Sequence, residues 1–233
     1  MMPPDTAPPV PGYRLRQKRR DRVGLALAAG LSMLAGMTDA IGFMATGDFV
    51  SFMSGNTTRL AVAISEGELA VMGRLALAIV IFVIGNALGI VVARLGGRRA
   101  LPLLLVIGAL LCAAALLPVQ AHLPTLVCAI LAMGMLNAAV EQVSGMAVGL
   151  TYVTGALSRF GRSLGRWLLG ERRAGWGVQL VPWAGMFVGA VLGALLEHRL
   201  GMAALLVSAG LAGALGLVTL GIPRRWQRCY MPR

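Results

Sequence analysis

The stretch Ser51-Phe-Met-Ser-Gly-Asn-Thr-Thr-Arg59 interrupts the most apolar half of a very apolar chain. A continuous helix in lipid has no use for five consecutive small or polar residues, here Ser54, Gly55, Asn56, Thr57 and Thr58. In hydrocarbon, irregular backbone survives only where it is buried in protein or lines a wet cavity. We therefore interpret Ser54–Thr58 as the break of a discontinuous helix that holds Arg59. The alternative is a polar outer loop between two spans.

Composition places the chain in a membrane. Its 233 residues are 58% hydrophobic and 13% charged, whereas an ordinary soluble domain is about 25% charged. The net charge of +12 does not indicate a nucleic-acid partner, because Lys and Arg gather in the cytoplasmic loops of membrane proteins. The excess of Arg over Lys, with abundant Ala and Gly, is typical of a GC-rich bacterial gene. Three scattered cysteines (Cys112, Cys128, Cys229) do not suit a disulfide framework or a metal site, so we expect neither metal nor cofactor.

Six apolar runs each have about the 17–25 residues that a membrane span requires. They cover residues 23–45, 75–93, 100–119, 123–140, 178–196 and 200–222. Two weaker segments, 46–65 and 145–165, are interrupted by Gly, Thr, Ser and Arg. The sequence thus predicts an all-α polytopic protein of about six transmembrane helices and two broken or re-entrant segments. A disordered basic tail over 1–22 and a basic tail over 223–233 flank one membrane domain over 23–222.

The order of the motifs predicts an internal duplication, with halves over about 23–119 and 123–222. Three pairs of segments match in the same order and at nearly constant offset: Met33–Ala40 with Leu131–Ala138, Ser51–Ala61 with Thr151–Gly161, and Gly85–Gly89 with Gly189–Gly193. The glycines of the last pair, with Gly185, form small-xxx-small faces for close helix contact. We interpret them, and Asn86 between them, as packing residues.

Charge decides between two topologies. If both broken segments are re-entrant, six helices span the membrane and both termini are cytoplasmic. Of the 21 Lys and Arg residues, only Arg59, Arg74 and Arg199 then lie outside. If both segments cross, eight helices span, and Arg94–Arg99 moves outside against the positive-inside rule. We favour six spans, which makes the halves inverted repeats, a recurrent plan among transporters.

Two motifs carry a family resemblance. At Asp39-Ala40 and at Phe49-Val-Ser-Phe-Met-Ser-Gly-Asn-Thr-Thr58 the chain resembles the YoaK-like family of multi-pass bacterial membrane proteins, which are classed as a domain of unknown function. The resemblance covers nearly all of the chain after residue 22. It implies an integral inner-membrane protein of about six spans and brings with it no substrate and no established activity.

Ionisable groups within spans are costly and mark function by default. Asp39 precedes the first break, and its counterpart in the second half is Asn137. Glu141 follows Asn137 by one helical turn and so lies on the same face. Each break also has an arginine four residues after its glycine: Arg59 after Gly55, and Arg159 after Gly155.

These groups have two interpretations. In the structural one, a buried Asp/Glu–Arg pair locks each broken helix to its neighbour. In the functional one, the helix that restarts after Ser54-Gly55 or Thr154-Gly155 presents free N–H groups, which favour anions, and Asp39 or Glu141 carries a proton. We predict a small-solute site between the halves, for a polar or anionic solute. Its residues are Asp39, Ser54, Gly55, Asn56, Thr57, Arg59, Asn137, Glu141, Thr154, Gly155 and Arg159.

Three function classes remain open. A transporter or channel predicts a polar cavity converging on Asp39, Asn56 and Glu141, whereas a structural or accessory subunit predicts these groups paired and dry. An intramembrane lipid-modifying enzyme is the least favoured, because the sequence shows no His-containing metal cluster and no Gly-x-Ser-x-Gly elbow. We therefore expect no enzyme. The predicted partners are the lipid bilayer, a small solute and, as an option, a second copy of the chain.

Overall fold

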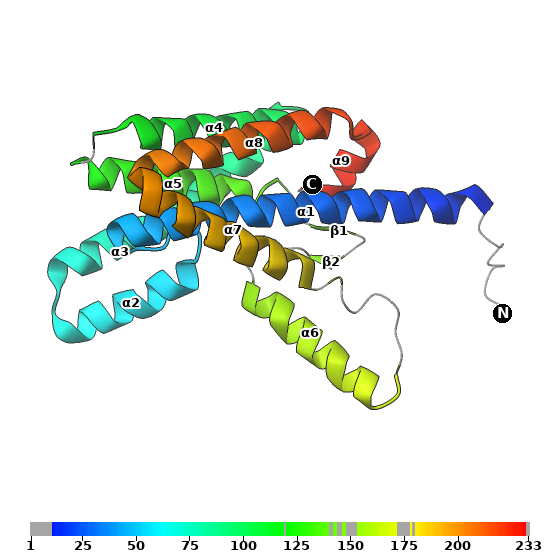
Figure 1. The fold of residues 1–233 in the computed structure, drawn as a ribbon, viewed down its shortest axis with the longest axis horizontal. Helices are drawn as coiled ribbons and strands as arrows, with labels where there is room; N and C mark the ends of the chain where they lie inside the picture. The colour runs from blue at the N-terminus through cyan, green and yellow to red at the C-terminus, as the bar shows by residue number, and fades with distance from the viewer. Residues whose placement is uncertain are drawn as a thin grey trace.

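The structure is a computed structural model that describes residues 11–118, 120–139, 142–143, 146–147, 153–171, 178 and 180–231. These residues form an all-α fold, as predicted, apart from one antiparallel pair of two-residue strands (Figure 1). The elements are α1 (Pro11–Thr46), α2 (Met53–Glu66), α3 (Leu69–Leu95), α4 (Ala100–Leu116), α5 (His122–Leu136), β1 (Gln142–Val143), β2 (Met146–Ala147), α6 (Val153–Leu168), α7 (Leu180–Leu200), a 3-10 turn (Gly201–Ala204), α8 (Leu205–Leu220) and α9 (Arg224–Tyr230).

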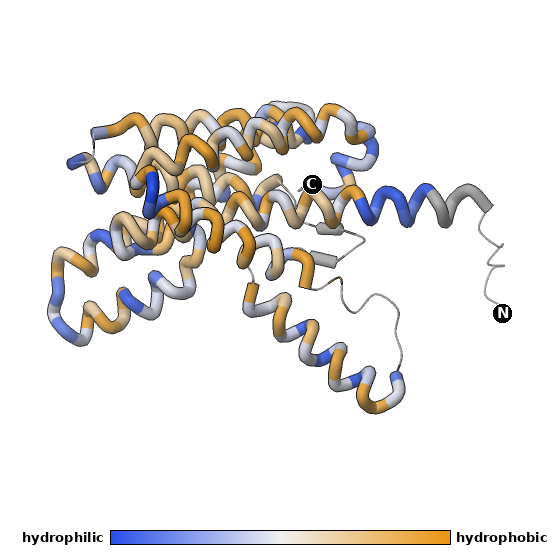
Figure 2. Tube along the Cα trace, in the orientation of Figure 1, coloured by the Kyte–Doolittle hydropathy of each residue, from blue (hydrophilic) through white to orange (hydrophobic). Residues whose placement is uncertain are grey.

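Each predicted apolar run coincides with a helix: α1, α3, α4, α5, α7 and α8. Within the described residues, three helical stretches are long and apolar enough to cross a membrane: Arg16–Thr46, Leu69–Leu95 and Leu180–Leu220. The last joins α7 to α8 through Gly201–Ala204, where the chain reverses (Figure 1). The apolar helices α4 and α5 are shorter, at 17 and 15 residues, or about 25 and 22 Å. Their sides and those of α3, α7 and α8 are largely hydrophobic (Figure 2).

The prediction of a disordered tail over 1–22 was wrong for residues 11–22. These residues are the first turns of α1. Arg and Lys, which are frequent between Arg14 and Arg22, are good helix formers. The helix therefore begins before the apolar run and continues into it without a break. Residues 1–10 lie outside the described part of the chain.

Glycine brings the helices of the two halves into backbone contact. An added Cβ at Gly189 on α7 would overlap the carbonyl oxygen of Met33 on α1. At Gly85 on α3 an added Cβ would lie 2.6 Å from the carbonyl oxygen of Leu131 on α5. Thus α1 packs on α7, and α3 packs on α5. The predicted packing role of these small residues is confirmed, since only a residue without a side chain permits such an approach.

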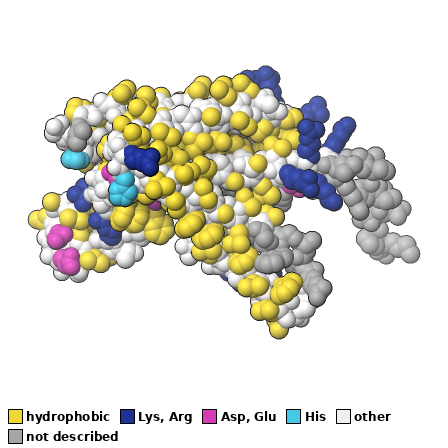
Figure 3. All heavy atoms as spheres, viewed as in Figure 1, with side chains coloured by type: hydrophobic (Ala, Val, Ile, Leu, Met, Phe, Trp, Pro, Cys, Tyr) yellow, Lys and Arg dark blue, Asp and Glu magenta, His cyan; other side chains and the backbone are white. Residues whose placement is uncertain are grey.

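One end of the molecule gathers the basic segments. The hydroxyl of Tyr230 on α9 donates to the carbonyl oxygen of Arg20 at 2.6 Å, and Gln227 Oε1 accepts the N–H of Ala100 at 3.1 Å. The start of α1, the α3–α4 loop and α9 therefore meet at one end. Lys and Arg side chains cluster at this end (Figure 3), where Asp21 pairs with Arg20 at 3.6 Å.

The first break lies at residues 47–52, between α1 and α2. The prediction that Ser54–Thr58 is the break was wrong by about one turn, because these residues form the beginning of α2. Their hydroxyls are compatible with a helix: Thr57 Oγ1 donates to the Met53 carbonyl at 2.8 Å, the i−4 contact that Thr makes in helices. Residues 51–54 share a cavity with Phe82–Asn86, near the middle of α3. The start of α2 thus lies beside the middle of α3. From their first residues, α2 and α6 run toward opposite ends of the molecule (Figure 1).

Candidate functional site

The carboxylate of Asp39 anchors the break to α1. Its Oδ1 accepts the backbone N–H groups of Val50 and Ser51, each at 2.8 Å, and the residue is only 6% exposed. Hydrogen bonds to an ionised acceptor are roughly twice as strong as neutral ones. Asp39 therefore supplies partners for two backbone groups that the broken helix leaves unpaired. Asp39 is thus held by the backbone of the loop before α2, and not by the N–H groups of the helix start at which an anionic solute was predicted.

Asn56 holds the same loop from the other side. This fully buried side chain accepts the Phe49 N–H at 3.1 Å and donates to the Phe49 carbonyl at 2.6 Å. Phe49 in turn stacks on Phe43, with ring centroids 4.6 Å apart, and meets the edge of Phe52 at 5.3 Å. A Cβ at Gly55 would lie 2.6 Å from the Phe52 ring. The signature residues Gly55 and Asn56 are thus explained by the fit of α2 onto its own loop.

Two arginines share one fully buried carboxylate. Arg59 Nη1 lies 2.6 Å from Asp48 Oδ1, and Arg74 Nε lies 2.5 Å from Asp48 Oδ2. Arg59 also donates to the carbonyl oxygen of Gly47, whose φ of +77° lies in the left-handed region that glycine tolerates. The structural interpretation, in which a buried carboxylate pairs with the arginine of the broken segment, was right about Arg59 and wrong about its partner. Arg59 pairs with Asp48, whereas Asp39 accepts backbone N–H groups.

A cavity of about 420 Å³ lies where α2 begins. Its polar lining comes from Ser51 and Ser54 at the break, Asn86 on α3 and Asn137 just after α5. It joins the two halves of the chain, since α3 belongs to the first half and α5 to the second. Asn86 Nδ2 donates to the Phe82 carbonyl of its own helix at 2.9 Å. Because Asn86 also lines the cavity, its interpretation as a packing residue is incomplete.

The second-half residues are placed less completely. Thr154, Gly155 and Arg159 lie on the first two turns of α6, where a Cβ at Gly155 would be 3.4 Å from Arg159 Nη1. Glu141 lies outside the described residues. Of the predicted site, the structure brings Asp39, Asn56 and Arg59 around one loop, and Ser54 and Asn137 into one cavity.

Two contributors were not assigned to the site from sequence: Asp48 and Arg74. Asp48 was not among the candidate residues, and Arg74 was predicted only to lie outside the membrane. No spacing signal links them, because the two residues are 26 positions apart and meet only through the fold. Ser51 was quoted in the signature without a role. Among the described residues, no group of three or more His, Cys, Asp or Glu side chains could hold a metal ion.

An all-α bundle with several long apolar helices, the first of them followed by a break that lies beside the middle of α3, defines an integral membrane protein. The chain belongs to the family described as "Protein of unknown function (DUF1275)", which matches residues 27–218. It is also similar to a UPF0700 transmembrane protein of Rhizobium meliloti (strain 1021), at 53% identity over 219 residues, which cover 94% of this chain and 96% of that protein. No solved structure matches the chain.

Proposed function

We propose that the chain is a transporter or channel for a small polar solute, with its pathway between two inverted halves. The observation that carries the proposal is the cavity of about 420 Å³ at the start of α2, where both halves supply amide or hydroxyl groups beside the middle of the apolar helix α3. Discontinuous helices at a repeat interface form the solute sites of many transporters. A small polar lining in an otherwise apolar bundle is also the general pattern of a ligand pocket.

Matched contacts support the inverted repeat. Gly85 meets Leu131 as Gly189 meets Met33, and these four residues are the pairs that the sequence alignment of the halves equates. Similarly, Gly89 lies on Met135 as Gly193 lies on Met37. The opposite directions of α2 and α6 (Figure 1) fit the same two-fold relationship.

The orientation belongs to the same proposal. The basic end, where α1 begins and α9 lies, faces the cytoplasm of a bacterial cell, so both termini are cytoplasmic and the membrane is the inner one. The positive-inside rule and the gathering of Lys and Arg at this end (Figure 3) support this choice. In this arrangement six helices span and α2 and α6 are re-entrant.

Flux into proteoliposomes tests the pathway. Small polar and anionic solutes are compared with empty liposomes, and uptake above that background is expected for at least one. Asn137→Leu and Ser54→Ala should lower the flux, because both remove polar groups from the cavity. Ser65→Ala is the matched control: it makes the same change at an exposed residue near the other end of α2, which does not line the cavity. The absence of flux across a broad panel, or equal loss in Ser65→Ala, contradicts the proposal.

A structural or accessory subunit is the second candidate. The observation in its favour is that Asp39 and Asn56 are buried and bonded to backbone, as a scaffold predicts. Under this alternative, Ser54 and Asn137 can be replaced without consequence, and loss of function follows protein stability alone. Measuring flux and melting temperature on the same variants separates the two candidates.

A further inference from the structure

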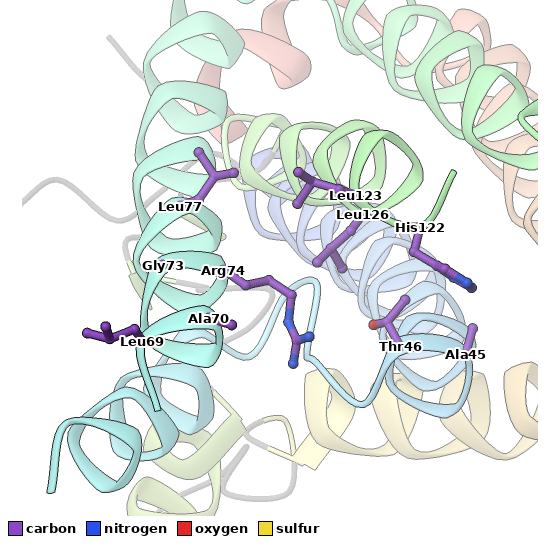
Figure 4. Close-up of a pocket in the computed structure, with 10 residues that line it drawn as sticks. All are labelled: Ala45, Thr46, Leu69, Ala70, Gly73, Arg74, Leu77, His122, Leu123 and Leu126. Atoms are coloured by element: carbon purple, nitrogen blue, oxygen red, sulfur yellow. The ribbon is translucent and has the colours of Figure 1, made fainter. Parts of the chain in front are cut away.

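A second cavity, of about 690 Å³, lies at the end of the molecule opposite the basic segments. It lies between the end of α1, the start of α3 and the start of α5 (Figure 4). This volume falls within the roughly 300–1,000 Å³ range of small-molecule pockets. It is separate from the cavity at the start of α2, because the two have no lining residue in common.

The walls of this outer cavity are mostly apolar, with the polar side chains of Thr46 and His122 and one guanidinium, that of Arg74. Leu69 and Leu77 come from α3, and Leu123 and Leu126 come from α5. Arg74 extends from α3 toward the end of α1, where Thr46 lies (Figure 4). The cavity therefore offers hydrophobic contact along its sides and a guanidinium within it.

The cation is only partly compensated. Asp48 is the carboxylate that Arg74 contacts, and Arg59 contacts it too. Two positive charges on one negative charge leave one positive charge over. Asp48 meets Arg74 through Nε, with Nη2 at 3.5 Å. A guanidinium has five N–H donors, so others remain for a ligand, and the Arg74 side chain is 40% exposed.

We propose that this outer cavity binds a small monocarboxylate with a short apolar chain, entering from the face opposite the basic end. The carboxylate pairs with Arg74, since a guanidinium matches the planar geometry of a carboxylate. The apolar chain of the ligand lies along Leu77, Leu123 and Leu126. One uncompensated charge favours a monoanion over a dianion, and the apolar walls disfavour inorganic anions, which would lose their hydration without gaining contact.

Gly73 offers a way to fill the cavity without touching its charge. It lines the cavity, and an added Cβ there meets nothing within 4 Å. Gly73→Leu therefore places a side chain in the ligand's space, while replacing a helical glycine favours the helix. Gly210→Leu is its matched control, because Gly210 is an exposed helical glycine on α8 whose Cβ position is equally open.

The experiment measures hexanoate binding by isothermal titration calorimetry, with the protein in nanodiscs of phosphatidylcholine. Hexanol and hexylamine are the neutral and cationic controls. Hexanoate should bind and the two controls should not. Gly73→Leu and Arg74→Gln should each weaken hexanoate binding at least tenfold, whereas Gly210→Leu and Arg199→Gln should leave it unchanged. Arg74→Gln still leaves Asp48 paired with Arg59.

Any one of the following results overturns the proposal: no hexanoate binding to the wild type, undiminished binding to Gly73→Leu, or equal binding of hexylamine. If phosphatidylglycerol in the nanodiscs abolishes hexanoate binding in proportion to its content, the occupant is a lipid headgroup and the carboxylate assignment is wrong. The proposal does not rest on transport. Binding can be present when flux through the cavity at Ser54 and Asn137 is absent, and the reverse also holds.

Discussion

Oδ1 of Asp39 lies 2.8 Å from the backbone nitrogen of Ser51, twelve residues further along the chain. This hydrogen bond ties the loop at residues 47–52 to a residue seven positions before the end of α1. The chain must therefore turn back along α1 before α2 begins. The position of the turn at residues 47–52 follows from one carboxylate placed within an apolar helix, where an unpaired charge would be costly.

Replacing Asp39 should destabilise the protein in a graded way. Asp39→Ala leaves two buried N–H donors unpaired, at about 1–3 kcal/mol each, so we expect a loss of about 2–6 kcal/mol. Asp39→Asn keeps an acceptor oxygen and should lose clearly less. Thermal unfolding in detergent measures both variants. Equal melting temperatures for Asp39→Ala and the wild type would show that the loop is held by other contacts.

The shared carboxylate makes a second prediction. Asp48→Asn removes the negative charge between Arg59 and Arg74 and should lower the free energy of unfolding by about 1–3 kcal/mol. This is less than the roughly 3–5 kcal/mol of a fully buried pair, because both arginines reach solvent. Glu66→Gln, an exposed acid at the end of α2, is the control and should change stability by less than about 0.5 kcal/mol.

The glycine contacts predict a position-dependent cost for one methyl group. Gly189→Ala drives a Cβ into the Met33 carbonyl, and overpacking of this kind costs about 1–3 kcal/mol or more. Gly210→Ala adds the same methyl group to open space and should be neutral or slightly stabilising. The melting temperatures of Gly189→Ala and Gly210→Ala measure this difference. A similar loss in both variants would point to helix propensity rather than to the α1–α7 contact.

Tyr230 gives stability a dependence on alkaline pH. Burial raises the pKa of its phenol from 10.0 to about 12, and the neutral hydroxyl donates to the Arg20 carbonyl. Because the folded state holds this proton more tightly than the unfolded state, the contribution is complete below pH 10. It should be lost as the pH rises from about 10 to about 12. Tyr230→Phe should be less stable at pH 8 and should show a weaker decline across that interval.

Cysteine labelling tests the six-span topology. In a Cys229→Ser background, Glu68→Cys at the turn before α3 should react with an impermeant maleimide in intact cells. Arg99→Cys, in the exposed loop before α4, should react only after permeabilisation. Both sites are exposed, so the difference reports sidedness rather than burial. The reverse pattern would mean that α2 crosses the membrane and that eight helices span.

The helices could be predicted from the sequence because their signals are local. The length of each apolar run is sufficient to indicate a span, and the spacing of Gly85 and Gly89 is sufficient to indicate a contact face. The same holds for the all-α class. The start of α1 was predicted at residue 23 and lies at Pro11. A basic segment can be helical or unfolded, and here it is helical because it continues directly into the following span.

The site was predicted less well because its geometry depends on distant partners. The break lies at residues 47–52 because Asp39 captures two amides there, and no local pattern states which amides a carboxylate will reach. Arg59 was assigned to the broken segment correctly, but its pairing with Asp48 emerges only when the loop folds back. Asn86 was read as packing because a lone amide in an apolar helix serves packing and cavity lining equally well.

The crossed contacts of α1 with α7 and of α3 with α5 bear on how the protein is made. Each helix meets its backbone-to-backbone neighbour in the other half of the chain: Gly189 and Met33 are 156 residues apart in the sequence (189 − 33), and Gly85 and Leu131 are 46 apart (131 − 85). During synthesis, the face of α1 that contacts the glycines of α7 therefore stays unpaired in the bilayer until α7 has been made. A chain truncated after α4 is expected to be a substrate for membrane quality control rather than a smaller folded protein.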